Sequence, residues 1–254
     1  MTEPPLLSLR NISKSFPAGE GQRRVLDGVN LDVYPGECLI IAGPNGSGKT
    51  LLMKIAAGLS DPSEGEVLYR GIPPRAAELY AGLGLVFQDA DAQIIGETVR
   101  EDAAFGPRNL GLSRQEAVKA AEEALETAGL AGKFDFPSRR LSGGEKRRLA
   151  VAGILAMGCR AMIFDEPFAN LDWPGVKSVL RIMGDLKSRG HTLIILTHEL
   201  EKVLALADRL VILHRGRIRE NGSPPEVLAR LCEDYGVRNP LRSVTRVEDC
   251  SWLA

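Results

Sequence analysis

The chain has 254 residues, of which 44% are hydrophobic and 26% are charged, which is ordinary for a globular protein with a sizeable core. Its formal net charge of −1 gives no electrostatic reason to expect nucleic-acid binding. No apolar run approaches about 18 residues, and the N-terminus lacks the pattern of a signal peptide, so we expect neither a membrane span nor a cleaved leader.

Short apolar runs alternate with helix-forming segments along most of the chain. The middle and late runs, such as CLIIA at 38–42 and TLIIL at 192–196, are apolar throughout, which is typical of parallel strands covered by helices on both faces. The early runs alternate apolar and polar residues and predict a smaller antiparallel sheet with one face in solvent. The predicted strands are Leu6–Ile12, Val25–Val33, Cys38–Ala42, Gly65–Tyr69, Leu83–Phe87, Arg160–Phe164, Thr192–Leu196, Leu210–His214 and Arg217–Asn221.

A glycine-rich loop, GPNGSGKT, follows the strand at 38–42 and precedes a helix-forming run that starts at Leu51. Its glycines let backbone N–H groups approach phosphate oxygens, and the helix start adds a positive end at the same place. Lys49 supplies a charge for the β- and γ-phosphates, and Thr50 a hydroxyl for Mg²⁺. The predicted nucleotide-binding residues of this loop are Gly43, Pro44, Asn45, Gly46, Ser47, Gly48, Lys49 and Thr50.

Residues 90–158 are rich in helix-forming sequence and interrupt the α/β pattern. The stretch Pro107–Gly111 is predicted to be a connector between helices. Three Ser-x-x-Glu pairs predict helix starts, because each serine can cap a helix whose glutamate bonds back to it. They are Ser113 with Glu116, Ser142 with Glu145 and Ser223 with Glu226. We expect one domain over residues 1–230, with a helical subdomain at about 90–158 and an appended tail over 231–254.

The cysteines are spread along the chain without the spacing of a zinc site. Cys38 and Cys159 lie in apolar runs and are predicted to be buried, reduced thiols, as in a cytoplasmic protein. The cysteines therefore predict neither a disulfide framework nor a structural metal.

Polar side chains follow several of the predicted parallel strands. Asp165 and Glu166 end one strand, where acidic residues point into the ligand crevice of an α/β sheet. Asp165 can join a Mg²⁺ shell, and Glu166 can polarise an attacking water. Gln88 can bind the ion or orient water, and His198 ends a strand at the same edge. A helix cap, a surface amide and a structural histidine are the simpler interpretations, but the neighbouring phosphate loop favours the functional ones.

The segment LSGGE at 141–145 is a serine-capped helix start with two glycines, which predicts a second anion site. LSGGE is the signature of the ATP-binding cassette family, and the chain resembles that family over about residues 6–230. GPNGSGKT resembles the family's Walker A motif, MIFDE its Walker B motif and Asn170–Asp172 its D-loop. Gln88 matches the Q-loop glutamine and His198 the switch histidine. Phe16 stands at the place of the aromatic that stacks on adenine, with a core aromatic as the alternative.

The resemblance implies a P-loop NTPase of the cassette type, with a RecA-like core, a small antiparallel β-subdomain and an inserted helical subdomain. It implies ATP and Mg²⁺ as ligands and Glu166, His198, Gln88 and Lys49 as catalytic residues. It also implies two cassettes in head-to-tail contact, in an identical or an unlike pair. Each ATP would then meet the phosphate loop of one chain and Ser142, Gly143 and Gly144 of the other.

The residues after Gln88 narrow the resemblance to one branch of the family. VFQDADAQIIGETVREDAAFGPRNLGLS is similar to the ATPase subunits of energy-coupling factor transporters, which take up vitamins or cobalt and nickel ions. The resemblance implies a membrane-peripheral ATPase on the cytoplasmic face, with a transmembrane coupling subunit and a substrate-binding membrane subunit as partners. Asp91 and Gln93 are candidates for transmitting the nucleotide state, with local capping as the alternative.

Some residues depart from the family pattern. The segment DEPFANLDW places Phe168, Asn170 and Trp173 where the family commonly has DEPTAGLDP, and Ala90 replaces a usual proline. The alternatives left open are a cassette of another importer, a non-transport cassette ATPase, and a nearly inactive regulatory cassette. A single cassette without a heptad run or basic face disfavours the second, and intact Glu166 and His198 disfavour the third. The sequence specifies neither the solute nor the identity of the partner cassette.

Overall fold

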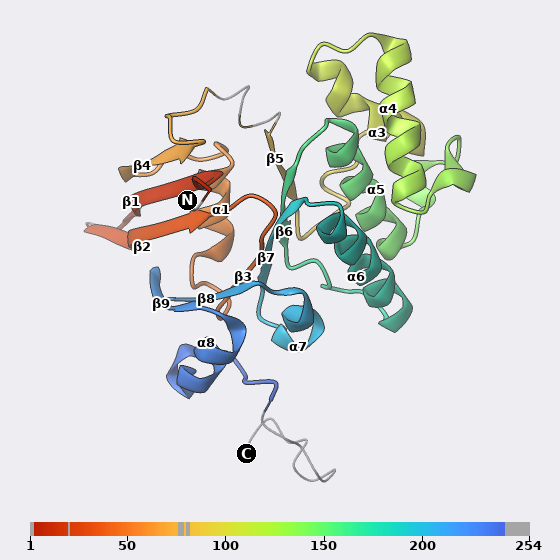
Figure 1. Cartoon of the computed structure of the whole chain (residues 1–254). Coiled ribbons are helices and arrows are strands. Elements are labelled where there is room, and N and C mark those ends of the chain that lie inside the picture. The colour runs from red at the N-terminus through yellow and green to blue at the C-terminus, as the bar shows by residue number, and fades with distance from the viewer. Residues whose placement is uncertain (1–2, 20, 76–78, 80–81, 242–254) are drawn as a thin grey trace.

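The computed structural model describes residues 3–19, 21–75, 79 and 82–241. All nine predicted strands form, with ends shifted by a few residues, and two sheets contain them (Figure 1). The expected α/β architecture with a separate small antiparallel sheet is therefore confirmed. The strands are β1 (Leu7–Ala18), β2 (Gly21–Val33), β3 (Cys38–Ala42), β4 (Glu64–Tyr69), β5 (Leu83–Val86), β6 (Ala161–Asp165), β7 (Thr192–Thr197), β8 (Arg209–His214) and β9 (Arg217–Gly222).

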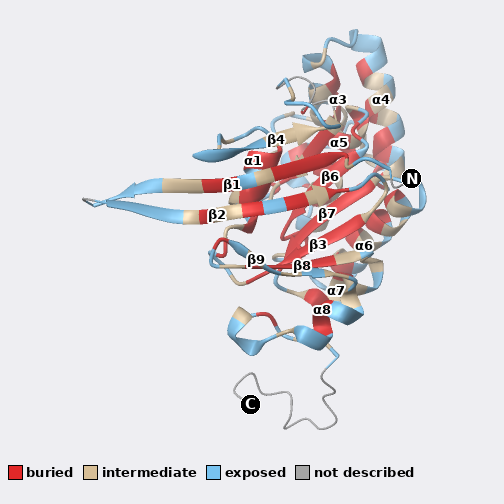
Figure 2. Ribbon diagram, turned by 60° about the vertical axis from the view of Figure 1, so that its left-hand side comes forward, coloured by how far each residue is buried: buried red, intermediate tan, exposed pale blue. Residues whose placement is uncertain are grey.

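The central sheet has the order β5-β6-β7-β3-β8-β9, and only β9 runs antiparallel to its neighbour. Strands β3, β6 and β7 are buried along their whole length because both of their faces are covered, whereas β9 at the edge is polar and partly exposed. Leu39 and Ile41 of β3 belong to the core shared with helix α1 (Lys49–Ala56) and the antiparallel sheet. Ile40 belongs to the opposite core, which helices α5 (Gly143–Ala156) and α6 (Trp173–Ser188) cover (Figure 2).

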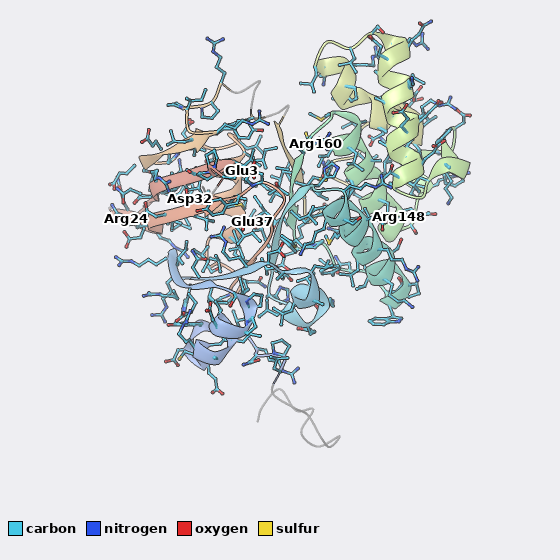
Figure 3. All side chains as sticks on the ribbon, in the orientation of Figure 1. Glu3, Arg24, Asp32, Glu37, Arg148 and Arg160 are labelled. Carbon is cyan, nitrogen blue, oxygen red and sulfur yellow. The ribbon has the colours of Figure 1, made fainter. Side chains whose placement is uncertain are left out.

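The second sheet is antiparallel, in the order β2-β1-β4, as the alternating sequence predicts. Its β1–β2 hairpin extends beyond the domain, and the residues toward its tip are exposed (Figure 2). Arg209 of β8 joins this sheet to the central one, because its guanidinium bonds the Asp32 carbonyl of β2 and pairs with Glu37 at 2.7 Å. Figure 3 labels both of these partners, Asp32 and Glu37. This junction lies at the amino end of β8, whereas the phosphate loop lies near the carboxyl end of the same strand.

The helical subdomain contains α3 (Val99–Asn109) and α4 (Arg114–Thr127), which pack with α5 around an alanine-rich core. All three predicted capping boxes form, and Thr98 with Glu101 forms a fourth at the start of α3. The prediction of a connector at Pro107–Gly111 is wrong at its beginning, because α3 continues to Asn109. Pro107 removes only one backbone hydrogen bond, and it is buried in the last turn of the helix.

The chain continues through the short helices α7 (Leu200–Val203) and α8 (Pro224–Arg230). Beyond residue 230, Val237 is buried in the core, and the Tyr235 ring meets His214 edge to face at 6.0 Å. A methyl group added at Gly236 would lie 3.3 Å from Pro44, so this part of the chain reaches the phosphate loop. The remainder of the predicted tail, 242–254, lies outside the described residues. Within the described ranges, no helix is both long enough and apolar enough to cross a membrane.

Candidate functional site

The glycine loop leaves the carboxyl end of β3, between β7 and β8 in the centre of the sheet. Two of its positions require glycine, because any side chain there would collide with a neighbouring strand. A methyl group at Gly43 would lie 2.1 Å from the Leu213 carbonyl oxygen, and one at Gly48 would lie 2.7 Å from Leu26. Gly48 also has φ of +104°, a left-handed conformation that side chains disfavour. The loop can therefore pack tightly against β8 and β2 while its N–H groups stay accessible.

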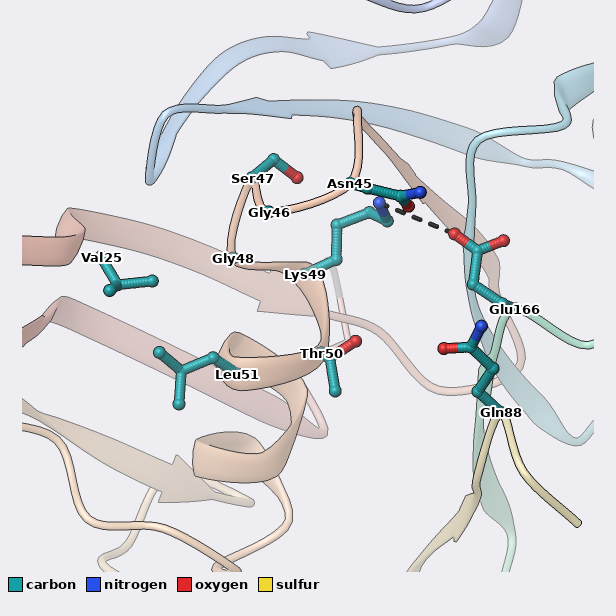
Figure 4. Close-up of a pocket in the computed structure, with 10 residues that line it drawn as sticks. All are labelled: Val25, Asn45, Gly46, Ser47, Gly48, Lys49, Thr50, Leu51, Gln88 and Glu166. Carbon is teal, nitrogen blue, oxygen red and sulfur yellow. Dashed lines mark ion pairs between the residues drawn. The ribbon is translucent and has the colours of Figure 1, made fainter.

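A pocket of about 250 Å³ opens over this loop (Figure 4). Gln88, just beyond β5, and Glu166, just beyond β6, face the loop from the opposite side of the pocket. Residues far apart in the sequence meet here because parallel strands end at one edge of the sheet. The pocket is lined by Val25, Asn45, Gly46, Ser47, Gly48, Lys49, Thr50, Leu51, Gln88 and Glu166.

Lys49 and Glu166 form a buried ion pair across the pocket, with 3.7 Å between Nζ and Oε1. The Lys49 ammonium also donates to the carbonyl oxygens of Gly43 at 2.6 Å and Pro44 at 3.2 Å. Burial lowers the pKa of Lys49, and the nearby carboxylates of Glu166 and Asp165 oppose that shift. The ammonium is thus held at the place where phosphate oxygens would bind it.

Thr50 and Asp165 bring two oxygen ligands together beside the loop, with the Thr50 hydroxyl donating to Asp165 Oδ1 at 3.1 Å. Burial raises the pKa of Asp165, and the charge of Glu166 raises it further. A cation at this place would stabilise the ionised carboxylate. Hydroxyl and carboxylate oxygens are ligands that Mg²⁺ accepts, so the residues present fit that ion.

Glu166 has a left-handed backbone, with φ of +43°. Such a conformation costs about 1–3 kcal/mol for a residue with a side chain, and it persists only where neighbours hold it. The Glu166 N–H donates to Leu196 of β7 at 3.0 Å, and the Ala169 N–H donates to the Glu166 carbonyl at 3.1 Å. His198, the predicted switch histidine, places Nδ1 3.0 Å from Glu166 Oε1.

Asp91 and Gln93, the residues predicted to transmit the nucleotide state, lie in the loop after Gln88 and make local contacts there. Gln93 accepts a hydrogen bond from the Phe87 N–H at 3.1 Å and donates to the Leu85 carbonyl at 3.2 Å. Asp91 pairs with Lys146 on α5. Gln93 therefore fixes the end of β5, and Asp91 ties the same loop to the helical subdomain.

Three predicted nucleotide-binding residues do not line the pocket; Gly43 and Pro44 belong to the loop itself, and the third is Phe16. It lies opposite Arg23 on the β1–β2 hairpin, 43% exposed, with Lys14 Nζ 5.5 Å from its ring. Val25, lower on the same hairpin, lines the pocket instead. Sequence reasoning missed Val25, because an apolar residue in a strand carries no signal that distinguishes a ligand contact from core packing.

The signature segment lies at a second pocket of about 510 Å³, which shares no lining residue with the first. Ser142 caps α5 there, and the Glu145 N–H donates to its hydroxyl at 3.4 Å. Gly143 and Gly144 form the first turn, and Asn170–Asp172 forms the opposite wall. The segment predicted to form a second anion site therefore lies apart from the phosphate loop of the same chain.

Comparisons with known proteins agree with these motifs. The family model described as ABC transporter matches residues 26–169. The energy-coupling factor transporter ATP-binding protein EcfA of Methanocaldococcus jannaschii is 42% identical over 229 residues, covering 88% of this chain and 81% of that protein. The structure of CbiO1 from Clostridium perfringens, a part of the ABC transporter complex CbiONQ, has a TM-score of 0.79 and 33% identity, covering 89% of this chain and 92% of that one. The cassette MJ0796, solved as a dimer bound to ADP and phosphate, has a TM-score of 0.76 and 28% identity, covering 85% and 98%.

Proposed function

This chain belongs to the ABC transporter family, and we propose that it is the ATP-hydrolysing subunit of an energy-coupling factor type uptake transporter. The pocket in which Lys49 and Glu166 meet across the glycine loop carries the ATPase part of the proposal. The uptake part rests on the likeness to EcfA and CbiO1, which extends over most of the chain.

ATP would bind with its phosphates along the backbone N–H groups of the loop. Lys49 would exchange its contact with Glu166 for the β- and γ-phosphates, which frees the carboxylate. Glu166 would then orient a water for in-line attack on the γ-phosphorus, and the products are ADP and phosphate. His198, already 3.0 Å from the carboxylate, would stabilise the charge that develops on the γ-phosphate.

Thr50 and Asp165 would hold the magnesium ion of the nucleotide. When bound, this ion neutralises charge on the β- and γ-phosphate oxygens. Gln88 lines the same pocket from the end of β5, where its amide oxygen would bind the ion or orient the attacking water. One side of the site would therefore offer several oxygen ligands, from Thr50, Asp165 and Gln88.

A second cassette would complete each ATP site. Ser142 and its two glycines line a pocket that is separate from the phosphate loop of their own chain. Two chains in head-to-tail contact would bring the Ser142 end of one α5 helix to the nucleotide of the other. The dimeric form of MJ0796 supports pairing of this kind.

The membrane partners would contact the helical subdomain at the cytoplasmic face of the membrane. Ile95, two residues after Gln93, and Phe105 on α3 are 58% and 48% exposed. Exposed apolar side chains of this size favour a protein interface. Asp91 and Gln93 would then carry a change at the interface to Gln88.

Reconstitution tests the transport part of the proposal. The chain is isolated from its own membranes together with its subunits, and the complex is placed in vesicles with ATP on the cytoplasmic side. We expect vitamin, cobalt or nickel uptake that requires ATP and stops with the Glu166→Gln chain. ATP turnover by a chain that co-purifies with no membrane subunit, and supports no uptake, would favour a non-transport ATPase.

A further inference from the structure

Arg147 is a buried charged residue on α5, about one and a half turns after Ser142, and its side chain is almost fully enclosed with 4% exposed. Its guanidinium donates to four backbone carbonyl oxygens on two loops. The acceptors are Gln88 at 2.8 Å and Phe87, Glu166 and Ala169 at 3.4 Å. Arg147 therefore touches the backbone of both pocket residues that face the phosphate loop.

We propose that Arg147 is a positioning residue that holds Gln88 and Glu166 in their catalytic places and links them to the signature end of α5. This inference deepens the proposed ATPase function and rests on it. Its consequence is that a shift of α5, caused by a nucleotide engaging Ser142, reaches the chain's own Glu166 through one side chain.

The burial of this guanidinium needs a reason beyond packing. Removing a charge from water is costly, and a buried arginine is usually paired with a carboxylate. Among the described residues Arg147 forms no ion pair; only the more distant charges of Asp89 and Asp165 oppose the desolvation that lowers its pKa. An apolar residue would fill the same space without this penalty. The planar fork of arginine presents donors on separate nitrogens in fixed directions toward the two loops, whereas an apolar residue has no donor and a lysine has all its donors on one atom.

Glu166 is the partner most sensitive to this contact. Its left-handed backbone is held by few hydrogen bonds, and its carbonyl receives two of them, from Arg147 and from the Ala169 N–H. Loss of the guanidinium would let the segment from Glu166 to Ala169 relax. A displacement of about 1 Å at a catalytic group can reduce turnover about 10²-fold while substrate still binds.

The test separates positioning from general stability by measuring kcat and KM for ATP with the purified chain. We expect Arg147→Lys to lower kcat by about 10- to 100-fold and to change KM by less than about threefold. Arg147→Met should lower kcat at least as much. The control is Arg209→Lys, which removes another multiply bonded arginine at the far junction of the two sheets and should leave kcat unchanged.

A double substitution shows whether Arg147 acts through Glu166. In the Glu166→Gln background, adding Arg147→Lys should reduce single-turnover hydrolysis by a smaller factor than in the natural chain, because one of the two positioned groups is already lost. The same 10- to 100-fold loss in both backgrounds would overturn the proposal, as would an unchanged kcat in Arg147→Lys.

Hydrogen exchange keeps the proposal testable if turnover is too low to compare. In folded Arg147→Lys, we expect faster backbone exchange in both 85–93 and 164–171, relative to Arg209→Lys. Unchanged exchange in these two segments, or faster exchange throughout the chain, would show that Arg147 does not hold the loops. If Arg147→Met is too unstable to purify, Arg147→Lys keeps the charge and carries the comparison alone.

Discussion

His198 Nδ1 lies 3.0 Å from Glu166 Oε1, and Lys49 Nζ lies 3.7 Å from the same oxygen. A histidine from the end of β7 and the lysine of the phosphate loop thus share one carboxylate oxygen. A γ-phosphate entering the pocket would compete with Glu166 for Lys49, because both are anions. The carboxylate would be left with His198 and become available to water.

Replacing Glu166 with glutamine should keep nucleotide binding and reduce ATP turnover by about 10²–10⁴-fold, because glutamine cannot accept a proton from water. Equilibrium binding of ATP and steady-state release of phosphate measure the two effects separately. His198→Ala is the companion variant, which removes a neighbour of the carboxylate but leaves the carboxylate itself. Turnover in Glu166→Gln close to that of the natural chain would exclude Glu166 as the group that activates water.

Replacing Asp165 with asparagine should stabilise the nucleotide-free protein at pH 7 while abolishing most magnesium-dependent turnover. Burial raises the pKa of Asp165, so the folded state favours the protonated form. As pH rises from the ordinary pKa through the raised one, the unfolded chain loses its proton first, and stability falls. The stability difference between the variant and the natural chain should therefore be largest above the raised pKa and shrink toward pH 4.

Thermal unfolding at several pH values measures this difference, with a shift of about 2–4 °C for each kcal/mol in a chain of this size. Asparagine retains an acceptor for the Thr50 hydroxyl, so the comparison isolates the charge. An Asp165→Asn variant that unfolds at a lower temperature than the natural chain at pH 7 would contradict the expected penalty of burying this carboxylate.

The cysteines should differ sharply in reactivity in the folded protein. Burial raises the pKa of Cys38 to about 12 and that of Cys159 to about 11, whereas Cys232 is exposed. Only the thiolate reacts with an alkylating reagent, so brief treatment at pH 8 should label Cys232 and spare the two buried thiols. Peptide mass mapping reads the pattern, with denatured protein as the control. Labelling of Cys38 as fast as Cys232 would show that the central sheet opens readily.

Much of the fold could be predicted from the sequence because its signals are local. Apolar runs such as CLIIA require cover on both faces, and β3 has it. Each serine–glutamate pair predicts a helix start from two residues only three positions apart, and all three pairs form capping boxes. The end of α3 was missed because the proline signal is local as well, whereas the burial of Pro107 depends on tertiary packing.

The residues around the pocket were harder to place where their roles depend on distant contacts. Gln88 and Glu166 follow strands, so their common edge follows from a parallel sheet. Arg147 lies in the visible run LSGGEKRR, yet nothing in that run distinguishes a buried guanidinium from its exposed neighbours. Its four acceptors come from β5 and β6 loops and become apparent only when those loops meet α5.

The division of each ATP site between two chains is tested most directly with two differently tagged copies of the chain. One pair carries Ser142→Tyr in one copy and Glu166→Gln in the other; the second pair carries both changes in one copy beside an unchanged copy. If Ser142 serves the partner's nucleotide, the first pair retains one intact site and up to about half of the turnover, while the second pair retains none. Turnover in the second pair and none in the first would show that each chain forms its own complete site.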